Sequence, residues 1–394
     1  MFIFGTRPEA IKMAPVIKAL KDGGSKFKAI VCVTAQHREM LDQVLNLFEI
    51  EPDYDLNIMR DDQSLFDVTT KGLIGIREVL EKEKPDIVLV QGDTTTTTFI
   101  AGLAAFYLKI PVGHIEAGLR TNDKYQAFPE EINRRLTSHI ADLHFAPTER
   151  TRNNLIQEHV PENRIWVTGN TVIDALLSIV SRQKSVSSQK YWNSYFKEKW
   201  NLTLTTNIDS NTNNLKLVLV TGHRRENFGE GFKNICYALK EIAENNDNVV
   251  IVYSVHLNPN VQKPVYQILG SNPTNPTNRV NSKNVFLIHP LDYEPFVYLM
   301  SRSYLILTDS GGIQEEAPSL GKPVLVMRDK TERLEAVEAG TVRLVKTDRN
   351  LIAGETQKLL NSEDAYKKMA KSINPYGDGK AAERIVNVLE EAFE

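Results

Sequence analysis

The feature that most constrains the fold is a regular alternation of short, wholly apolar segments with longer segments of helical periodicity. The apolar segments have the length of strands buried on both faces of a parallel sheet. Helical stretches separate them, for example residues 130–143, where Ile132, Leu136 and Ile140 recur every fourth residue. This order predicts βαβ units, and two successive sets of strands predict two doubly wound α/β domains. The expected strands are residues 29–33, 86–90 and 165–167 in the first half and residues 217–220, 249–252, 305–307 and 324–326 in the second.

The chain has 394 residues, which is too long for one ordinary hydrophobic core. We expect the domain boundary just after the strand at 165–167, giving an N-terminal domain of residues 1–168 and a C-terminal domain of residues 169–378. A final helix is expected at about residues 379–394. Two polar, low-complexity stretches, 184–214 and 271–278, are predicted as a surface helix with a loop and as a second loop.

The composition excludes several classes of protein. A hydrophobic fraction of 41% and a charged fraction of 25% exclude a disordered or disulfide-stapled chain. The net charge of -3 gives no general attraction to nucleic acid or to acidic membrane surfaces, so neither partner is expected. No apolar run approaches the length of a bilayer span, and the first residues do not resemble a secretory leader. Cys32 and Cys236 lie inside apolar stretches. We therefore expect a cytoplasmic protein with two buried thiols.

Ligands of open α/β sheets bind beyond the carboxyl ends of the strands, so polar residues there are candidates for the site. In the first half, Arg7 and Lys12 either bind one anion or are solvated cations at a helix start. Asp93 ends a wholly apolar strand, where it either acts in a site or caps a helix. Glu116 lies between two glycines that give a ligand access to the backbone. Glu130 opens the helix at 130–143, where an acid also offsets the helix dipole.

The second half contributes two more strand-end segments. His223 follows a strand and precedes two arginines, which indicates either cationic donors for a phosphate or an acid–base imidazole. Ser310, Gly311 and Gly312 follow another strand and open a helix, so that their backbone N–H groups are expected to face a pyrophosphate. Glu316, one turn further on, is placed to hold a ribose diol.

The motifs of several cofactor sites are missing. The sequence has no phosphate-binding P-loop, no H-E-x-x-H and no G-x-G-x-x-G after a strand. Residues 377–382 spell G-x-G-x-x-A, but they are predicted as a loop before the last helix. His114 and Glu116 match part of a zinc-deaminase motif whose cysteine pair is missing, and His114 is equally well explained as a core histidine. No metal is predicted.

Taken together, these segments resemble the non-hydrolysing UDP-N-acetylglucosamine 2-epimerases. The resemblance implies a glycosyltransferase-B-like architecture, in which two Rossmann-like domains face a deep cleft and the last helix returns to the first domain. It also implies a homodimer that interconverts UDP-GlcNAc and UDP-ManNAc for surface polysaccharide synthesis. The matching motifs are residues 5–12, 34–40, 92–97, 116–121, 129–134, 222–226, 255–259, 309–318 and 327–329.

The resemblance further implies a mechanism that needs no cofactor. The C2–H of the sugar is not acidic, because its neighbour is an acetamido nitrogen and not a carbonyl. Expulsion of UDP first builds oxocarbenium character at C1, which acidifies C2–H. Loss of the proton gives 2-acetamidoglucal, and UDP then adds back after protonation on the opposite face. No hydride moves, so no nicotinamide is required.

The family pattern implies roles for individual residues. Asp93, Glu116 and Glu130 correspond to the acid–base carboxylates, without an order among them. His223 corresponds to a residue that contacts the diphosphate and the reacting centre. The implied substrate contacts are Arg7, Lys12, Leu291 through its backbone, Phe296, Ser310, Gly311, Gly312, Glu316 and Arg333.

Bacterial members of this family also bind a second UDP-GlcNAc beside the active site, which activates the reverse reaction. The corresponding positions here are Gln36, Gln63, Arg224 and His256. The chain departs from some relatives at Asp62, where they carry Arg. An acid in place of a base repels a diphosphate, so we expect allostery with a lowered affinity.

Three other functions remain open at this point. A glycosyltransferase of the same fold also holds UDP between two such domains, but it does not need three strand-end acids. A hydrolysing 2-epimerase releases UDP and free ManNAc. A sugar-nucleotide-binding regulator without turnover predicts lost acids, whereas all three acids are present.

Overall fold

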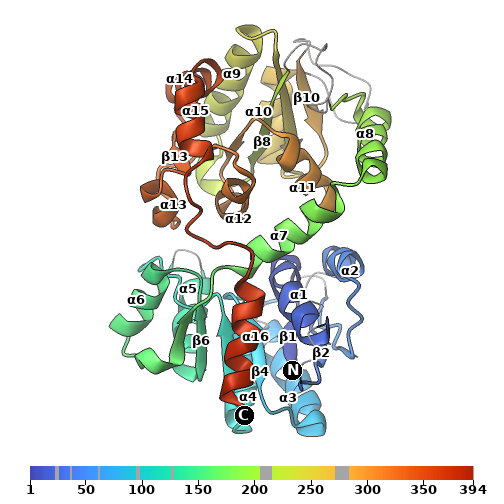
Figure 1. The fold of residues 1–394 in the computed structure, drawn as a ribbon, viewed down its shortest axis with the longest axis vertical. Coiled ribbons are helices and arrows are strands. Elements are labelled where there is room, and N and C mark those ends of the chain that lie inside the picture. Colours follow the sequence, from blue (N-terminus) through green and yellow to red (C-terminus); the bar gives the residue numbers. More distant parts are fainter. Residues whose placement is uncertain are drawn as a thin grey trace. The chain divides into compact units, whose positions relative to one another are not determined.

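The structure is a computed structural model, and it describes residues 1–22, 26–35, 38–60, 63–94, 98–125, 128–204, 215–270 and 284–393. The chain forms two compact units. Unit 1 comprises Met1–Leu177 together with Tyr376–Glu394, and unit 2 comprises Ser178–Pro375. Each unit contains its own parallel sheet, which agrees with the two doubly wound domains expected from the alternating pattern (Figure 1).

The sheet of unit 1 has the strand order β3-β2-β1-β4-β5-β6-β7, and all the paired strands are parallel. The chain starts at the centre of this sheet with β1, builds outward through β2 and β3, and then crosses back to β4. The strands are β1 (Phe2–Phe4), β2 (Val31–Val33), β3 (Tyr54–Asp55), β4 (Val88–Gln91), β5 (Val112–Ile115), β6 (Leu143–Ala146) and β7 (Ile165–Val167).

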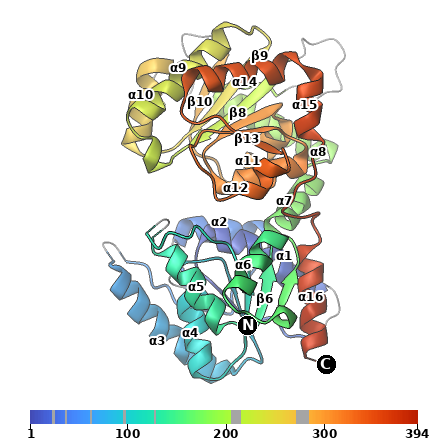
Figure 2. The same cartoon turned by 90° about the vertical axis from the view of Figure 1, so that its left-hand side faces the viewer.

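Helices cover both faces of this sheet. Helix α1 packs against α2 and α16, whereas α4 packs against both α3 and α5 on the other side of the sheet (Figure 2). The return of the C-terminal helix to the first unit is thus a direct contact between α16 and α1. The helices are α1 (Arg7–Asp22), α2 (Arg38–Leu47), α3 (Leu65–Glu83), α4 (Ile100–Tyr107), α5 (Glu130–Ile140), α6 (Glu149–Gln157), η2 (Glu162–Arg164), α7 (Thr171–Arg182) and α16 (Ala381–Ala392).

Helix α5 packs with its polar side inward. Its buried residues include Asn133 and Arg134, whereas Ile132 and Leu136 are 38% and 42% exposed. The apolar spacing therefore correctly predicts a helix, but this stripe does not face the core. The predicted end at residue 143 is wrong, because the helix stops at Ile140 and Leu143 already begins strand β6.

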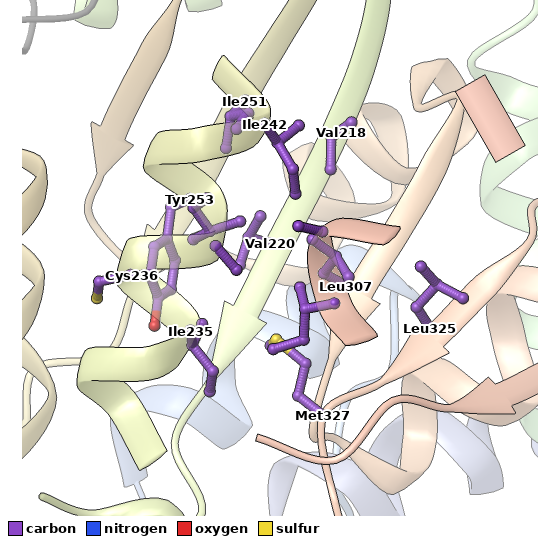
Figure 3. Packing of buried hydrophobic residues seen from close by; sticks show 14 of the residues in the cluster. Val218, Val220, Ile235, Cys236, Ile242, Ile251, Tyr253, Leu307, Leu325 and Met327 are labelled. Atoms are coloured by element: carbon purple, nitrogen blue, oxygen red, sulfur yellow. The ribbon is translucent and has the colours of Figure 1, made fainter. Parts of the chain in front are cut away.

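The sheet of unit 2 has the order β10-β9-β8-β11-β12-β13, again with parallel pairs. Its apolar strands are buried on both faces, as the unbroken Val, Ile and Leu runs predict. Val220 of β8 and Leu307 of β11 pack with Ile235 and Cys236 of α9 (Figure 3). The strands are β8 (Lys216–Gly222), β9 (Val249–Val255), β10 (Val285–Ile288), β11 (Leu305–Thr308), β12 (Val324–Val326) and β13 (Val342–Leu344).

Helix α8, which lies in the polar stretch predicted as a surface helix, is anchored by aromatic side chains. Trp192 and Phe196 are buried, and both rings lie against Tyr298 of α11. The rest of that stretch, residues 205–214, and the loop predicted at 271–278 lie outside the described residues. The helices of unit 2 are α8 (Val186–Trp200), η3 (Arg225–Asn227), α9 (Glu230–Glu244), α10 (Pro259–Leu269), α11 (Tyr293–Arg302), α12 (Gly311–Glu316), η4 (Ala317–Leu320), α13 (Leu334–Glu338), α14 (Arg349–Asn361) and α15 (Glu363–Ala370).

The division between the units falls inside α7, after Leu177, whereas the sequence-based boundary at 168/169 lies just before that helix. Residues 377–380 form an irregular segment with bends at Asp378 and Gly379 before α16, as predicted, whereas residues 381 and 382, which were also predicted in this loop, already begin the helix. Cys32 and Cys236 are both buried and free, as expected from their apolar neighbours. Within the described ranges, no helix is long and apolar enough to cross a membrane.

Candidate functional site

The first group of candidate residues lies where the strand order of unit 1 reverses, between β1 and β4. Ligands of doubly wound sheets bind at this position. Arg7 begins the helix that follows β1, and Asp93 follows β4 by two residues. The buried Glu9 carboxylate joins the two strand ends, because it accepts hydrogen bonds from the backbone of Thr6 (2.8 Å) and from the hydroxyl of Thr94. Arg7 and Asp93 therefore lie at the same edge of the sheet, which the contacts of Glu9 make rigid.

Glu116 is held in place by donors from three other elements. The Lys12 ammonium lies 2.6 and 2.7 Å from its two carboxylate oxygens. Asn170 donates a hydrogen bond to Oε1 at 2.9 Å, and the Gln91 amide donates one to Oε2. The backbone of Glu116 has a φ of +67°, a strained conformation for a non-glycine residue that is typical of functional sites. These contacts fix the position of both carboxylate oxygens of Glu116.

Asp93 is also arranged as a carboxylate. Its Oδ2 accepts a hydrogen bond from the guanidinium of Arg134, which belongs to the buried polar side of α5. Asn133, one residue earlier, donates to the backbone oxygen of Asp93 at 2.9 Å. Glu131 holds the Arg134 guanidinium from the other side at 3.0 Å. The inward-facing polar residues of α5 thus serve to position Asp93.

Glu130 has a different environment from the other two acids. Its Oε2 atom is buried and has no hydrogen-bond partner among the described residues. Burial raises the pKa of this carboxyl group, and the nearby charge of Asp93 raises it further. Carboxyl groups whose surroundings push their pKa values apart are the usual arrangement of an acid and a base in one site. The surroundings of Glu130 therefore favour its protonated form more than those of an ordinary exposed glutamate do.

His114 and His144 lie side by side beneath this site, on paired positions of β5 and β6. His114 Nε2 lies 2.8 Å from the backbone oxygen of Gly92, next to Asp93. Both rings are buried, and the Nδ1 atom of each has no partner among the described residues. This favours the interpretation of His114 as a core histidine.

The histidine pair makes the stability of unit 1 sensitive to acid. Burial lowers the pKa of His114 to about 4 and that of His144 to about 3, from an ordinary value of 6.5. Below pH 6.5 the unfolded chain therefore binds more protons than the folded chain. We expect each histidine to remove up to about 1.4 kcal/mol of unfolding free energy per pH unit as the pH falls from 6.5 towards the folded values. The contribution of the two neutral histidines to the unfolding free energy is fully present above pH 6.5.

Urea unfolding between pH 7 and pH 5 measures this effect. The wild-type chain should lose stability more steeply than the His114→Gln/His144→Gln double variant. His139→Gln, an exposed position on α5, is the matched control and should keep the wild-type slope. Equal slopes for the wild type and the double variant would contradict the account.

The second group of candidate residues lies at the corresponding reversal in unit 2, between β8 and β11. The two strand ends are joined by a 2.7 Å hydrogen bond between the Thr221 and Thr308 hydroxyls. His223 follows β8 and Asp309 follows β11. The two side chains meet, with 3.2 Å between His223 Nδ1 and Asp309 Oδ1. The imidazole is partly exposed, so it is accessible to a ligand.

The predicted nucleotide-binding residues of unit 2 lie on neighbouring elements. Ser310 is the N-cap residue of α12, which Gly311 and Gly312 open. The carboxylate of Glu316 is buried and accepts a hydrogen bond from the Tyr293 hydroxyl at 2.5 Å. Arg333 is placed against the start of α12, because a Cβ atom added to Gly311 would lie 3.1 Å from its guanidinium carbon.

The remaining predicted contacts are located as follows. Leu291 is buried just before α11, and Phe296 is a partly buried residue of that helix. Arg333 is itself held by Glu315, at 2.8 Å. The side chains predicted as substrate contacts are therefore held by neighbouring residues and are not scattered over the surface.

The predicted second nucleotide-sugar site is described only in part. Gln36 and Asp62 lie outside the described residues. Gln63, in unit 1, donates to the backbone oxygen of Ile58 at 2.6 Å. In unit 2, the His256 ring lies 5.7 Å from that of His223, and the Arg224 guanidinium lies 3.8 Å from Glu332. The allosteric site stays a prediction.

Several residues that hold the site were not selected from the sequence. They are the residues that orient the acids and the imidazole: Gln91, Asn133, Arg134, Asn170, Tyr293 and Asp309. A signal existed for three of them, because Gln91, Asn170 and Asp309 are polar residues at or just after strand ends. Within the parts of the chain that the structure describes, no cluster of three His, Cys, Asp or Glu residues is suited to hold a metal ion.

Two Rossmann-like units with polar strand ends at both reversal points define a glycosyltransferase-B-like α/β protein. The family model described as UDP-N-acetylglucosamine 2-epimerase matches residues 18–390, and the chain belongs to this family.

Individual relatives agree with this assignment. The chain is 57% identical over 388 residues to the UDP-N-acetylglucosamine 2-epimerase of Escherichia coli K12, covering 98% of this chain and 97% of the relative. It is 56% identical to that of Salmonella typhimurium LT2, with the same coverage. The crystal structure of UDP-GlcNAc 2-epimerase from Neisseria meningitidis bound to UDP-GlcNAc superimposes with a TM-score of 0.87, at 52% identity and 99% coverage of both chains.

Proposed function

We propose that this protein is an isomerase that interconverts UDP-GlcNAc and UDP-ManNAc. The observation that carries the proposal is the presence, in a member of this family, of three acids in contrasting environments at one edge of the unit 1 sheet. Asp93 and Glu116 are each paired with a cation, whereas Glu130 is partly buried beside the charge of Asp93. Proton removal and proton return at a carbon need such a difference between carboxyl groups.

We propose that the reaction passes through elimination and re-addition of UDP, with 2-acetamidoglucal as the intermediate. As the C1–O bond breaks, its electron pair leaves with UDP and the C2–H becomes acidic. An ionised carboxylate then takes the proton, and the C2–H electron pair forms the C1=C2 double bond. For the return, a protonated carboxyl group delivers a proton to the opposite face of C2, and UDP closes the bond to C1. Asp93 and Glu116 are arranged as bases, and Glu130 is arranged as the proton carrier.

Unit 2 is proposed to hold the nucleotide. The backbone N–H groups at Ser310, Gly311 and Gly312 and the imidazole of His223 face the diphosphate in this proposal. The buried Glu316, fixed by Tyr293, accepts hydrogen bonds from a ribose diol. Leu291, Phe296 and Arg333 complete the proposed nucleotide site of this unit. Arg7 and Lys12 are proposed as substrate contacts of unit 1. The product is proposed to serve as a precursor of surface polysaccharide.

Incubation with UDP-GlcNAc followed by analysis of the sugar products tests the function. The proposal requires UDP-ManNAc to form, with the nucleotide sugar retained, until the two sugars reach equilibrium. Stoichiometric release of UDP and free ManNAc would identify a hydrolysing enzyme instead. Binding of UDP-GlcNAc without turnover would identify a regulator.

We further propose that the protein is a homodimer and that the layer of α3, α4 and α5 forms the interface. All three helices of this layer carry large apolar side chains that are exposed. These side chains lie apart from the helix faces that are buried toward the sheet. They are Leu65, Phe66 and Ile74 of α3, Phe106 and Tyr107 of α4, and Ile132 and Leu136 of α5. Exposed apolar residues gathered on adjacent helices are typical of a protein–protein interface, and a twofold dimer pairs such a surface with itself.

The mass in solution tests this interface. We expect twice the chain mass of 44.5 kDa for the wild type and the single chain mass for Ile74→Glu/Phe106→Glu, because buried charges weaken dimerisation by at least about 10²-fold. Ile373→Glu, at a residue of unit 2 that is 86% exposed, should remain dimeric. Light scattering after gel filtration gives the masses. A dimeric double variant would exclude this surface, and a monomeric wild type would exclude the homodimer.

A further inference from the structure

Asp309 is a buried carboxylate whose contacts converge on one loop. It is fully buried at the end of β11, yet no cation pairs with its carboxylate oxygens among the contacts that the structure describes. Its oxygens accept hydrogen bonds from the backbone N–H groups of His223 and Arg224, both at 2.9 Å, and from the Asn227 amide at 3.1 Å. These neutral donors orient the Asp309 carboxylate and fix the loop that carries His223.

The His223 ring meets the same carboxylate through one nitrogen. Nδ1 lies 3.2 Å from Asp309 Oδ1, so that Nε2, on the far edge of the ring, is directed away from the buried carboxylate. The side chain of His223 is 40% exposed. Three other charged or titratable groups act on the ring: Arg224 from the same loop, His256 after β9 and Arg328 after β12.

We propose that Asp309 is a positioning residue that fixes His223 in the Nδ1–H tautomer, leaving Nε2 as the atom that takes up a proton against an anionic phosphate group. The identity of the ligand in this inference rests on the proposed function, whereas the tautomer of His223 does not. An ionised carboxylate at Nδ1 requires that nitrogen to carry the hydrogen, since two acceptors facing each other repel. The neutral ring then has its lone pair on Nε2.

The surroundings keep the ring neutral until a ligand arrives. Burial and the positive charges nearby lower the pKa of His223, while Asp309 opposes this effect. A diphosphate beside Nε2 adds negative charge and favours the imidazolium form, so one proton is taken up on binding. The protonated Nε2–H then donates to the oxygen on which negative charge develops as the diphosphate leaves. Asp309 stabilises this imidazolium from the opposite side.

The tautomer is measured directly on the full-length protein. Nitrogen NMR of histidine-labelled, ligand-free protein at pH 8 distinguishes a protonated nitrogen from an unprotonated one. The His223 signals are assigned by their loss in His223→Gln. We expect the protonated signal at Nδ1. A His223 ring protonated at Nε2 would overturn the proposal, whatever the protein catalyses, and this measurement needs no variant of Asp309 to fold.

A double-mutant cycle tests whether Asp309 acts through His223. We expect Asp309→Asn to lower kcat by about 10- to 100-fold, the scale for removing a carboxylate that orients an imidazole, and to move the titration of His223 to lower pH. In the His223→Gln background the same substitution should change kcat less than about threefold. Full additivity of the two losses, or an unmoved His223 titration, would show that Asp309 has only a structural role.

Discussion

We expect Asp93→Asn, Glu116→Gln and Glu130→Gln each to lose at least about 10²-fold of turnover while UDP still binds. Each substitution keeps the shape of the side chain and removes its ability to carry or accept a proton. Asp93→Asn removes one of the two negative partners of Arg134, the other being Glu131, and Glu116→Gln removes a negative partner of Lys12. Because the proposed UDP contacts lie mainly in unit 2, the nucleotide affinity should change far less than kcat.

Steady-state kinetics with both nucleotide sugars, together with calorimetric titration of UDP, separates these effects. Glu149→Gln is the matched control, because this carboxylate also lies in the first turn of a helix but is exposed. The control should retain wild-type turnover. Near-normal turnover in all three acid variants would show that the chemistry occurs elsewhere.

The largest effect on stability is expected for Gly118→Ala. Gly118 has a φ of +90°, and an added Cβ atom would lie 2.2 Å from the backbone oxygen of Thr151. Both sides of this contact are backbone, namely the loop after Glu116 and helix α6. Neither can move without displacing α6 from that loop. We expect the unfolding free energy to fall by at least about 3 kcal/mol, since overpacking adds to the strain of a left-handed alanine.

Gly229→Ala separates the two causes. Gly229 has a similar φ of +83°, but nothing lies within 4 Å of its added Cβ atom. This variant should therefore lose only the conformational part, about 1–3 kcal/mol for a backbone with φ of +83° and ψ of −120°. Urea unfolding of both variants gives the difference. If Gly118→Ala were as stable as Gly229→Ala, the close approach of α6 to this loop would be wrong.

The sequence predicts the fold well because the information for it is local. The strands predicted from the sequence are short apolar runs, most of them rich in Val, Ile and Leu, whereas β5, β6 and β13 contain polar residues and were not among them. Asp93, Glu116 and His223 could be selected from the sequence because each lies just after an expected strand or between glycines, and the carboxyl ends of parallel strands share one edge. Their proposed roles came from the family resemblance and from no local pattern.

The residues that hold the site depend on long-range packing, which a single sequence does not contain. Asn170 reaches Glu116 across 54 positions of the chain, and Asp309 reaches His223 across 86. The pattern of α5 misleads for a related reason, because Ile132 and Leu136 indicate a buried face while Asn133 and Arg134 are the buried residues. The helix turns its polar side to the site, and Ile132 and Leu136 on its apolar side stay exposed.

The most direct test of the account is the fate of the C2 hydrogen during turnover in D2O. Elimination and re-addition require the C2 proton to leave the sugar and solvent-derived hydrogen to return. We therefore expect deuterium at C2 of both UDP-GlcNAc and UDP-ManNAc as they equilibrate, detected by proton NMR and mass spectrometry. Epimerisation with the C2 hydrogen fully retained would contradict the roles proposed for Asp93, Glu116 and Glu130.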